Sequence, residues 1–161
     1  MKSVYLYAIN FCIVLSLLFE LSCKKSDMTT TGRLELSMLD SVNKLRGKGC
    51  RCGTDTMPPV RYLIWNNALA SAAQAHAQDM YNNNYFDHIS PNGSSPIQRA
   101  QNAGYTGQYI AENIAEGYGN IADVMSAWKS SPDHCKAMMD PLYIEMGAYS
   151  CGSYWVQEFG H

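Results

Sequence analysis

Residues 143–160 read Tyr-Ile-Glu-Met-Gly-Ala-Tyr-Ser-Cys-Gly-Ser-Tyr-Trp-Val-Gln-Glu-Phe-Gly, and this stretch decides the fold class. Its side chains alternate in two sets before and after a break at Cys151-Gly152-Ser153. Period-two alternation on both sides of a Gly-Ser turn predicts an antiparallel β-hairpin at the end of the chain.

Helical patterns occupy most of the chain before this hairpin. Helices are predicted over residues 34–45, 66–82, 96–102 and 121–128, and one strand is predicted over 110–114. Asn66 or Asn67 is placed to cap the second helix, and Pro132 should end the fourth. Helices first, a strand in the middle and a hairpin last predict an α+β fold with helices packed on a sheet.

The length and charge of the chain limit its class. Of 161 residues, about 138 remain after residues 1–23, which is enough for one domain with a single core. The net charge is -2, without a basic patch or an acidic tail, so we expect no nucleic-acid partner. No internal repeat or linker interrupts residues 34–160.

The first 23 residues have the features of an export signal. Lys2 precedes an apolar run of about 16 residues, shorter than the ~20 that a spanning helix needs. Ser22 stands directly before Cys23, which resembles the site where a bacterial lipoprotein is acylated, although Glu20 occupies a place where an aliphatic residue is usual. We therefore expect a lipid on Cys23 to hold the protein at the membrane. A soluble secreted protein and an uncleaved anchor are the alternatives.

The expected domain organisation follows from that signal. Residues 24–33 are polar and Thr-rich and are predicted to form a tether, and residues 34–161 form the domain. Under every alternative for the N-terminus, the domain is expected to work outside the cytoplasm.

Four cysteines belong to the folded part: Cys50, Cys52, Cys135 and Cys151. In an oxidising compartment we expect disulfides, and four cysteines allow three pairings. A Cys50–Cys52 bond would strain the backbone across a single residue, so we expect at least one of these two to bond Cys135. A zinc site made of thiolates is the competing interpretation, but one Cys-x-Cys without a second pair supports it poorly.

Two histidines and one carboxylate are candidate functional residues. His88 precedes a turn at Pro91-Asn92-Gly93, and a loop histidine held by a rigid scaffold can act as a ligand or a base. His134 follows Pro132 in what resembles a first helical turn, which disfavours its charged form and keeps a lone pair free for a metal. Glu112 could orient a histidine or act as a base toward a metal-bound water.

Two other titratable residues are given structural roles. His76 falls on the apolar stripe of its helix between Ala73 and Met80, so we expect a core histidine there. Glu116 belongs to the turn into Gly117 and is expected to face solvent.

An ordered set of motifs resembles the CAP superfamily of cysteine-rich secretory proteins, venom antigens and plant pathogenesis-related proteins, in its bacterial branch. The motifs are Phe86-x-His88, a Gly93-to-Arg99 step, Glu112-Asn113-Ile114-Ala115-x-Gly117, Val124-x-x-x-Trp128-x-x-Ser131-x-x-His134, Met146-Gly147 and Tyr154-Trp155-x-Gln157-x-Phe159-Gly160. The resemblance runs from about Leu34 to Gly160. It implies the three-layer α-β-α sandwich of the SCP domain.

The resemblance also implies a site. His88, Glu112 and His134 match two histidines and the first glutamate of the family's cleft, and Arg99 matches an arginine expected to brace the loop of His88. Ser131 stands where relatives carry a second glutamate, so the complete set lacks one member. The missing glutamate makes a hydrolytic mechanism a weaker expectation, whereas the expectation of metal binding by His88 and His134 does not depend on it.

Three functions are compatible with these residues. The first is a binding module, anchored by lipid, whose cleft holds a divalent metal and recognises a small lipid, peptide or envelope component. The second is a metal-dependent hydrolase with Glu112 as catalytic base. The third is a partner-docking domain with a vestigial cleft. Two imidazoles suit zinc, copper and nickel, and zinc is our first expectation.

Overall fold

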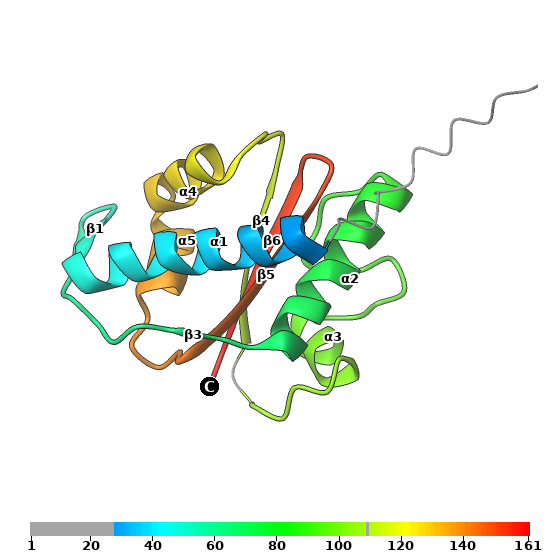
Figure 1. The fold of residues 1–161 in the computed structure, drawn as a ribbon, viewed down its shortest axis with the longest axis horizontal. Coiled ribbons are helices and arrows are strands. Elements are labelled where there is room, and N and C mark those ends of the chain that lie inside the picture. Colours follow the sequence, from blue (N-terminus) through cyan, green and yellow to red (C-terminus); the bar gives the residue numbers. More distant parts are fainter. Residues whose placement is uncertain (1–27, 109) are drawn as a thin grey trace, which may run out of the picture.

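The fold is a three-layer sandwich in which helices cover both faces of one four-stranded sheet (Figure 1). The computed structural model describes residues 28–108 and 110–161. The strands lie in the order β3 (Ile64–Trp65), β5 (Glu145–Cys151), β6 (Tyr154–Gly160) and β4 (Ile110–Glu116). β3 runs parallel to β5, and the other neighbours are antiparallel. The predicted α+β class, the α-β-α sandwich and the C-terminal hairpin are confirmed.

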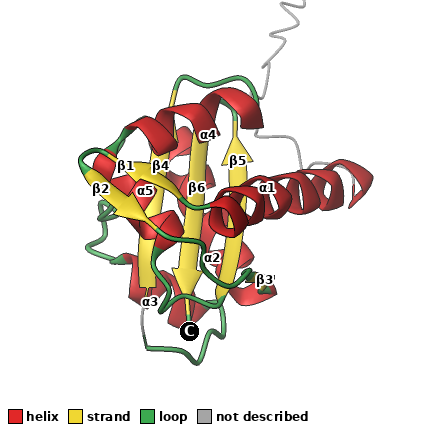
Figure 2. Ribbon diagram, turned by 90° about the vertical axis from the view of Figure 1, so that its left-hand side faces the viewer, coloured by secondary structure: helices red, strands yellow, loops and turns green. Residues whose placement is uncertain are grey.

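The helices divide between the two faces of the sheet. α2 (Asn67–Asn83) and α3 (Pro96–Asn102) lie on one side, and α1 (Met28–Lys48), α4 (Ile121–Ser130) and α5 (Pro132–Met139) lie on the other (Figure 2). Side chains of β6 alternate between the two helical layers. Trp155 and Phe159 pack with α1 and α4, and Tyr154 and Val156 pack with α2. Every residue of β6 is consequently buried.

α2 has the boundaries and the buried face that its sequence pattern predicts. The Asn66 side chain accepts hydrogen bonds from the backbone N–H groups of Ala68 and Leu69, at 2.9 and 3.2 Å, and so caps the helix. The apolar stripe packs against β5 so closely that a Cβ atom on Gly147 would overlap the backbone of Leu69 and Ala70. Gly147 therefore sets the distance between α2 and the sheet.

Several boundaries differ from the sequence prediction. α1 begins at Met28, so residues 28–33 of the predicted tether are helical. Once a helix has formed, each further residue adds one backbone hydrogen bond, so the helix can extend into a polar sequence. Pro132 not only ends α4 but also begins α5, where a missing N–H costs nothing. A small hairpin of β1 (Cys50–Cys52) and β2 (Asp55–Met57) stands in the predicted cysteine loop.

The predicted export signal and Cys23 lie outside the described residues. Within residues 28–108 and 110–161, no helix is long and apolar enough to cross a membrane.

Arg46, near the end of α1, is fully buried without a carboxylate partner in the described part of the chain. Its guanidinium donates to four backbone carbonyls, at 2.7–3.1 Å, which belong to Arg61, Met138, Asp140 and Tyr143. Burial lowers the pKa of Arg46 to about 10, and it remains charged at neutral pH. One side chain thus joins α1 to the loop before β3 and to the segment between α5 and β5.

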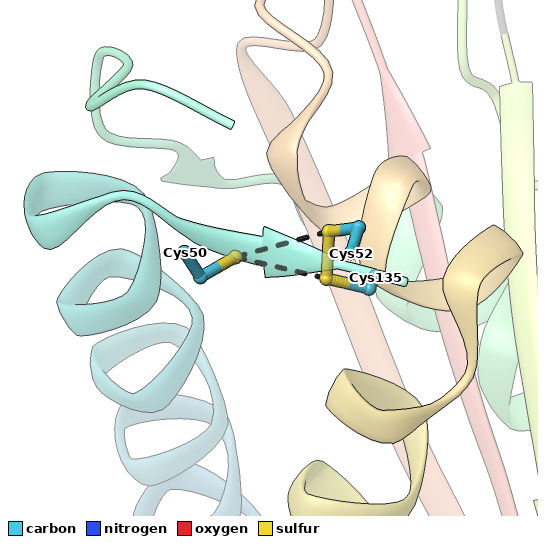
Figure 3. A group of neighbouring side chains, drawn as sticks. All are labelled: Cys50, Cys52 and Cys135. Atoms are coloured by element: carbon cyan, nitrogen blue, oxygen red, sulfur yellow. Dashed lines mark hydrogen bonds between the residues drawn. A yellow bond between two sulfur atoms is a disulfide. The ribbon is translucent and has the colours of Figure 1, made fainter. Parts of the chain in front are cut away.

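A disulfide joins Cys52 of β1 to Cys135 of α5 (Figure 3). This is one of the two pairings with Cys135 that the sequence left open, and Cys151 is also disulfide-bonded. Cys50 keeps a free thiol, so its predicted place in a disulfide is wrong. Cys135 is already bonded to Cys52, so it is not available to Cys50. Burial also raises the pKa of the Cys50 thiol, and a protonated thiol exchanges slowly with disulfides.

Candidate functional site

His88 lies on the loop that follows α2, and its side chain is 49% exposed. α2 ends at Asn83, and the C-cap residue Asn84, with a φ of 51°, turns the chain out of the helix. Arg99 of α3 then holds the loop from within by donating to the carbonyls of His88 and Ser94, at 3.0 and 2.8 Å. The predicted bracing role of Arg99 agrees with these contacts.

Glu112 of β4 is the centre of the site, with a side chain only 1% exposed. Its Oε2 lies 2.6 Å from an Arg99 guanidinium nitrogen, and its Oε1 lies 2.7 Å from His88 Nδ1. Burial alone would raise the pKa of Glu112, but the hydrogen bond from His88 and the positive charge of Arg99 bring it below the ordinary value. Glu112 is therefore ionised, and both of its oxygens already have partners.

The bond to Glu112 determines the state of His88. It raises the pKa of His88 above the ordinary value, because the carboxylate stabilises the imidazolium. It also occupies Nδ1, so Nε2 is the ring nitrogen left for another partner. In neutral His88 this places the proton on Nδ1 and the lone pair on Nε2.

His76 lies beneath this cluster. It is fully buried, its Nε2 is 2.9 Å from the carbonyl oxygen of Asp87, and the same nitrogen is 3.8 Å from Glu112 Oε2. Burial lowers the pKa of His76, so the neutral ring donates to Asp87 and fixes the start of the His88 loop. The predicted core role is confirmed, and Glu116 is exposed as expected.

Glu158 is a member of the site that the sequence did not suggest. It is fully buried on β6 and pairs directly with Glu112 across the antiparallel ladder. Neither of its oxygens accepts a hydrogen bond from the described residues. Burial, together with the nearby charge of Glu112, raises the pKa of Glu158 well above its ordinary value. Only the register of β4 on β6 could have revealed this pair.

His134 occupies the first turn of α5, as predicted from Pro132. Its carbonyl accepts a hydrogen bond from Asn113 Nδ2 at 3.2 Å, which ties α5 to β4 beside Glu112. Burial lowers the pKa of His134, and the positive charge of His88 lowers it further. The neutral ring therefore keeps a lone pair at neutral pH.

His134 and Ser131 line a groove of ≈ 450 Å³. Its other lining residues are mostly apolar or aromatic: Phe86, Ile114, Ala115, Glu116, Tyr118, Ala127 and Trp128. Ser131 is the N-cap residue of α5, but its hydroxyl makes no capping bond to the helix.

The predicted site residues are brought together in two groups. His88 and Glu112 are directly bonded, and His134 and Ser131 share the groove. Among the described residues, only Cys50, Cys52 and Cys135 offer three or more metal-ligand atoms within 4.8 Å of one another. Among the predicted residues, Glu112 is thus in direct contact with His88.

Comparison with known proteins gives a family match. The model of the cysteine-rich secretory protein family, CAP, matches residues 39–159. The uncharacterised protein YkwD of Bacillus subtilis is 36% identical over 96 residues, which is 58% of this chain and 37% of YkwD. The chain thus spans well under half the length of that relative.

Solved structures share the fold. An extracellular protein with an SCP domain from Bacillus anthracis has a TM-score of 0.67 at 21% identity, covering 84% of this chain and 44% of its own. An outer surface protein of Borrelia burgdorferi has a TM-score of 0.68 at 21% identity, covering 83% and 94%. NaASP2, crystallised with Zn²⁺, has a TM-score of 0.55 at 17% identity, covering 79% and 78%.

Proposed function

Because this chain belongs to the cysteine-rich secretory protein (CAP) family, we propose that it is an extracytoplasmic binding module. Its cleft would hold a divalent metal ion, with zinc as the first expectation, at His88 and His134. The ligand would be a small lipid, a peptide or another apolar component of the cell envelope.

The single observation that carries the metal site is the His88–Glu112 hydrogen bond of 2.7 Å. A carboxylate that accepts from one ring nitrogen orients the imidazole and raises the basicity of the other nitrogen, as second-sphere partners of zinc-bound histidines do. His88 Nε2 is left for the metal on a half-exposed ring. The neutral state of His134 supports the second ligand position. The Zn²⁺ in the NaASP2 structure is consistent with this use of the fold.

The groove beside His134 supports an apolar ligand. Its volume of ≈ 450 Å³ lies within the range of small-molecule sites, about 300–1,000 Å³. Phe86, Tyr118 and Trp128 supply aromatic surface, and the Ser131 hydroxyl supplies a polar group at one side. An acyl chain or an apolar peptide side chain would fit such a lining.

The environment of Glu112 favours binding over hydrolysis. A general base must reach a water molecule and accept its proton. Glu112 is buried, both of its oxygens are engaged by Arg99 and His88, and its pKa is below the ordinary value. Glu112 therefore suits the role of a positioning residue for His88.

The extracytoplasmic location rests on the relatives and on the N-terminal sequence. The similar structures belong to an extracellular protein and to an outer surface protein. The export signal with Cys23 as an acylated residue would place this domain on the membrane surface.

The metal site is tested by titrating the oxidised protein with Zn²⁺ in a calorimeter. We expect one ion to bind the wild type, and His88→Ala and His134→Ala each to weaken binding by at least about 10–100-fold, the loss seen for supporting residues of metal sites. His161→Ala removes an exposed histidine at the C-terminus and should leave the affinity unchanged. Equal affinity in all four proteins would refute the site.

A further inference from the structure

The sulfur atoms of Cys50, Cys52 and Cys135 form a cluster where β1 meets α5, and the proposed function does not use these side chains (Figure 3). Cys50 Sγ lies 3.8 Å from Cys52 Sγ and 3.6 Å from Cys135 Sγ. A free thiol therefore stands beside both sulfurs of the disulfide.

The local structure explains why three sulfurs meet. Cys50 and Cys52 are two positions apart on strand β1, and alternate residues of a strand point to the same side. Cys135 faces them from the first turns of α5. The spacing Cys-x-Cys on a strand thus presents two sulfurs to one helix.

The position of Cys50 does not suit attack on the disulfide. A thiolate that displaces one sulfur approaches along the S–S axis, so its distances to the two sulfurs would differ by about 2 Å, one bond length. The observed distances, 3.6 and 3.8 Å, are almost equal. Cys50 lies at the side of the bond, as the third corner of a triangle.

That triangle has the dimensions of a metal site. With Zn–S bonds of about 2.3 Å in a tetrahedron, neighbouring sulfurs lie about 3.8 Å apart. Two of the three edges already have this length, and only the bonded pair Cys52–Cys135 must separate. Two thioethers, Met57 and Met139, pack in the same cluster and add to its soft, apolar surroundings.

We propose that, when a dithiol reductant opens the Cys52–Cys135 disulfide, the three thiolates of Cys50, Cys52 and Cys135 bind one thiophilic metal ion such as Zn²⁺. The dithiol supplies two electrons and two protons to the disulfide and becomes a disulfide itself. The ion then displaces the three thiol protons into solvent. Cys50 is partly exposed, which leaves the fourth position open to water.

The cluster keeps its shape without the disulfide because other contacts join the same elements. Lys136 of α5 pairs with Asp55 of β2 at 2.6 Å, and Leu45, Val60 and Met57 pack around the sulfurs. The ion pair is exposed and contributes little by itself, so the apolar packing carries most of this support.

The test uses Co²⁺, whose charge-transfer absorption reports thiolate bonds and not imidazole bonds. The full chain is reduced with a dithiol, desalted without oxygen and titrated with Co²⁺ and then with Zn²⁺. We expect one Co²⁺ with thiolate absorption, which Zn²⁺ displaces, and a rise in the thermal midpoint on binding. The unreduced chain should show no thiolate absorption, because Cys52 and Cys135 are then joined in the disulfide.

Two variants with the same number of thiols sharpen the result. Cys50→Ser keeps the Cys52–Cys135 disulfide before reduction and should bind at least about 10–100-fold more weakly after it. Cys151→Ser removes a cysteine outside the cluster and should bind like the wild type. The inference is overturned if both variants bind equally, or if the reduced wild type shows no thiolate absorption with Co²⁺. His88→Ala should leave the thiolate absorption unchanged, which separates this site from the cleft.

Discussion

At Glu158 the chain carries a carboxyl group that stays protonated in the fold, since it is fully buried opposite the ionised Glu112. In the unfolded chain the same group ionises near pH ~4.3. The contribution of Glu158 to stability therefore falls as the pH rises above about 4, because the unfolded state releases a proton that the fold retains.

Glu158→Gln should remove this dependence, since an amide has nearly the same shape and cannot ionise. In urea denaturation, the stability of the variant relative to wild type should rise with pH, by at most about 1.4 kcal/mol per pH unit. Glu116→Gln, an exposed change on β4, is the control for exchanging a carboxylate for an amide and should stay within about 0.5 kcal/mol of wild type. A large loss of stability for Glu158→Gln at pH 7 would mean that Glu158 is needed as a charge.

At the scale of elements, α2 and β5 approach each other very closely at Gly147. A Cβ atom at this position would overlap the backbone of Leu69 and Ala70. Gly147→Ala should destabilise the protein by about 1–3 kcal/mol or more, the usual cost of overpacking, and chemical denaturation measures it. Gly119→Ala is the matched control, because its Cβ would meet nothing within 4 Å; it should stay within about 0.5 kcal/mol. Equal stability of the two variants would show that α2 moves away from the sheet at no cost.

For helices and strands, the length of an element determines whether the sequence could predict it. A long amphipathic helix encodes its buried face in its own period. The apolar stripe predicted for α2 is the same set as its buried residues: Leu69, Ala72, Ala73, His76, Ala77 and Met80. β1, β2 and β3 were not predicted, since strands of two or three residues have no measurable period. For the candidate site, motifs predicted His88, Glu112 and His134, but Glu158 becomes visible only through the pairing of β4 with β6. The free thiol of Cys50 depends on which sulfur reaches Cys135, which spacing alone does not determine.

For the whole molecule, the remaining prediction concerns where the domain is held. If Cys23 carries the lipid, Cys23→Ser should shift the protein from the membrane fraction to the soluble fraction, because the apolar run before it is too short to span comfortably. Fractionation followed by immunodetection measures the shift, and unchanged circular dichroism shows that the domain stays folded. A variant that remains in the membrane with an intact N-terminus would identify an uncleaved anchor instead.

The buried guanidinium of Arg46 has a consequence for the order of events in folding. Three of its four carbonyl acceptors lie 92–97 residues further along the chain. A cation enclosed before those acceptors arrive would be left without hydrogen bonds, which is costly, so the α1 layer closes late. While the chain is being synthesised, the first helix must wait until the segment after α5 has emerged. The α1 layer therefore reaches its native state only after Tyr143 has emerged.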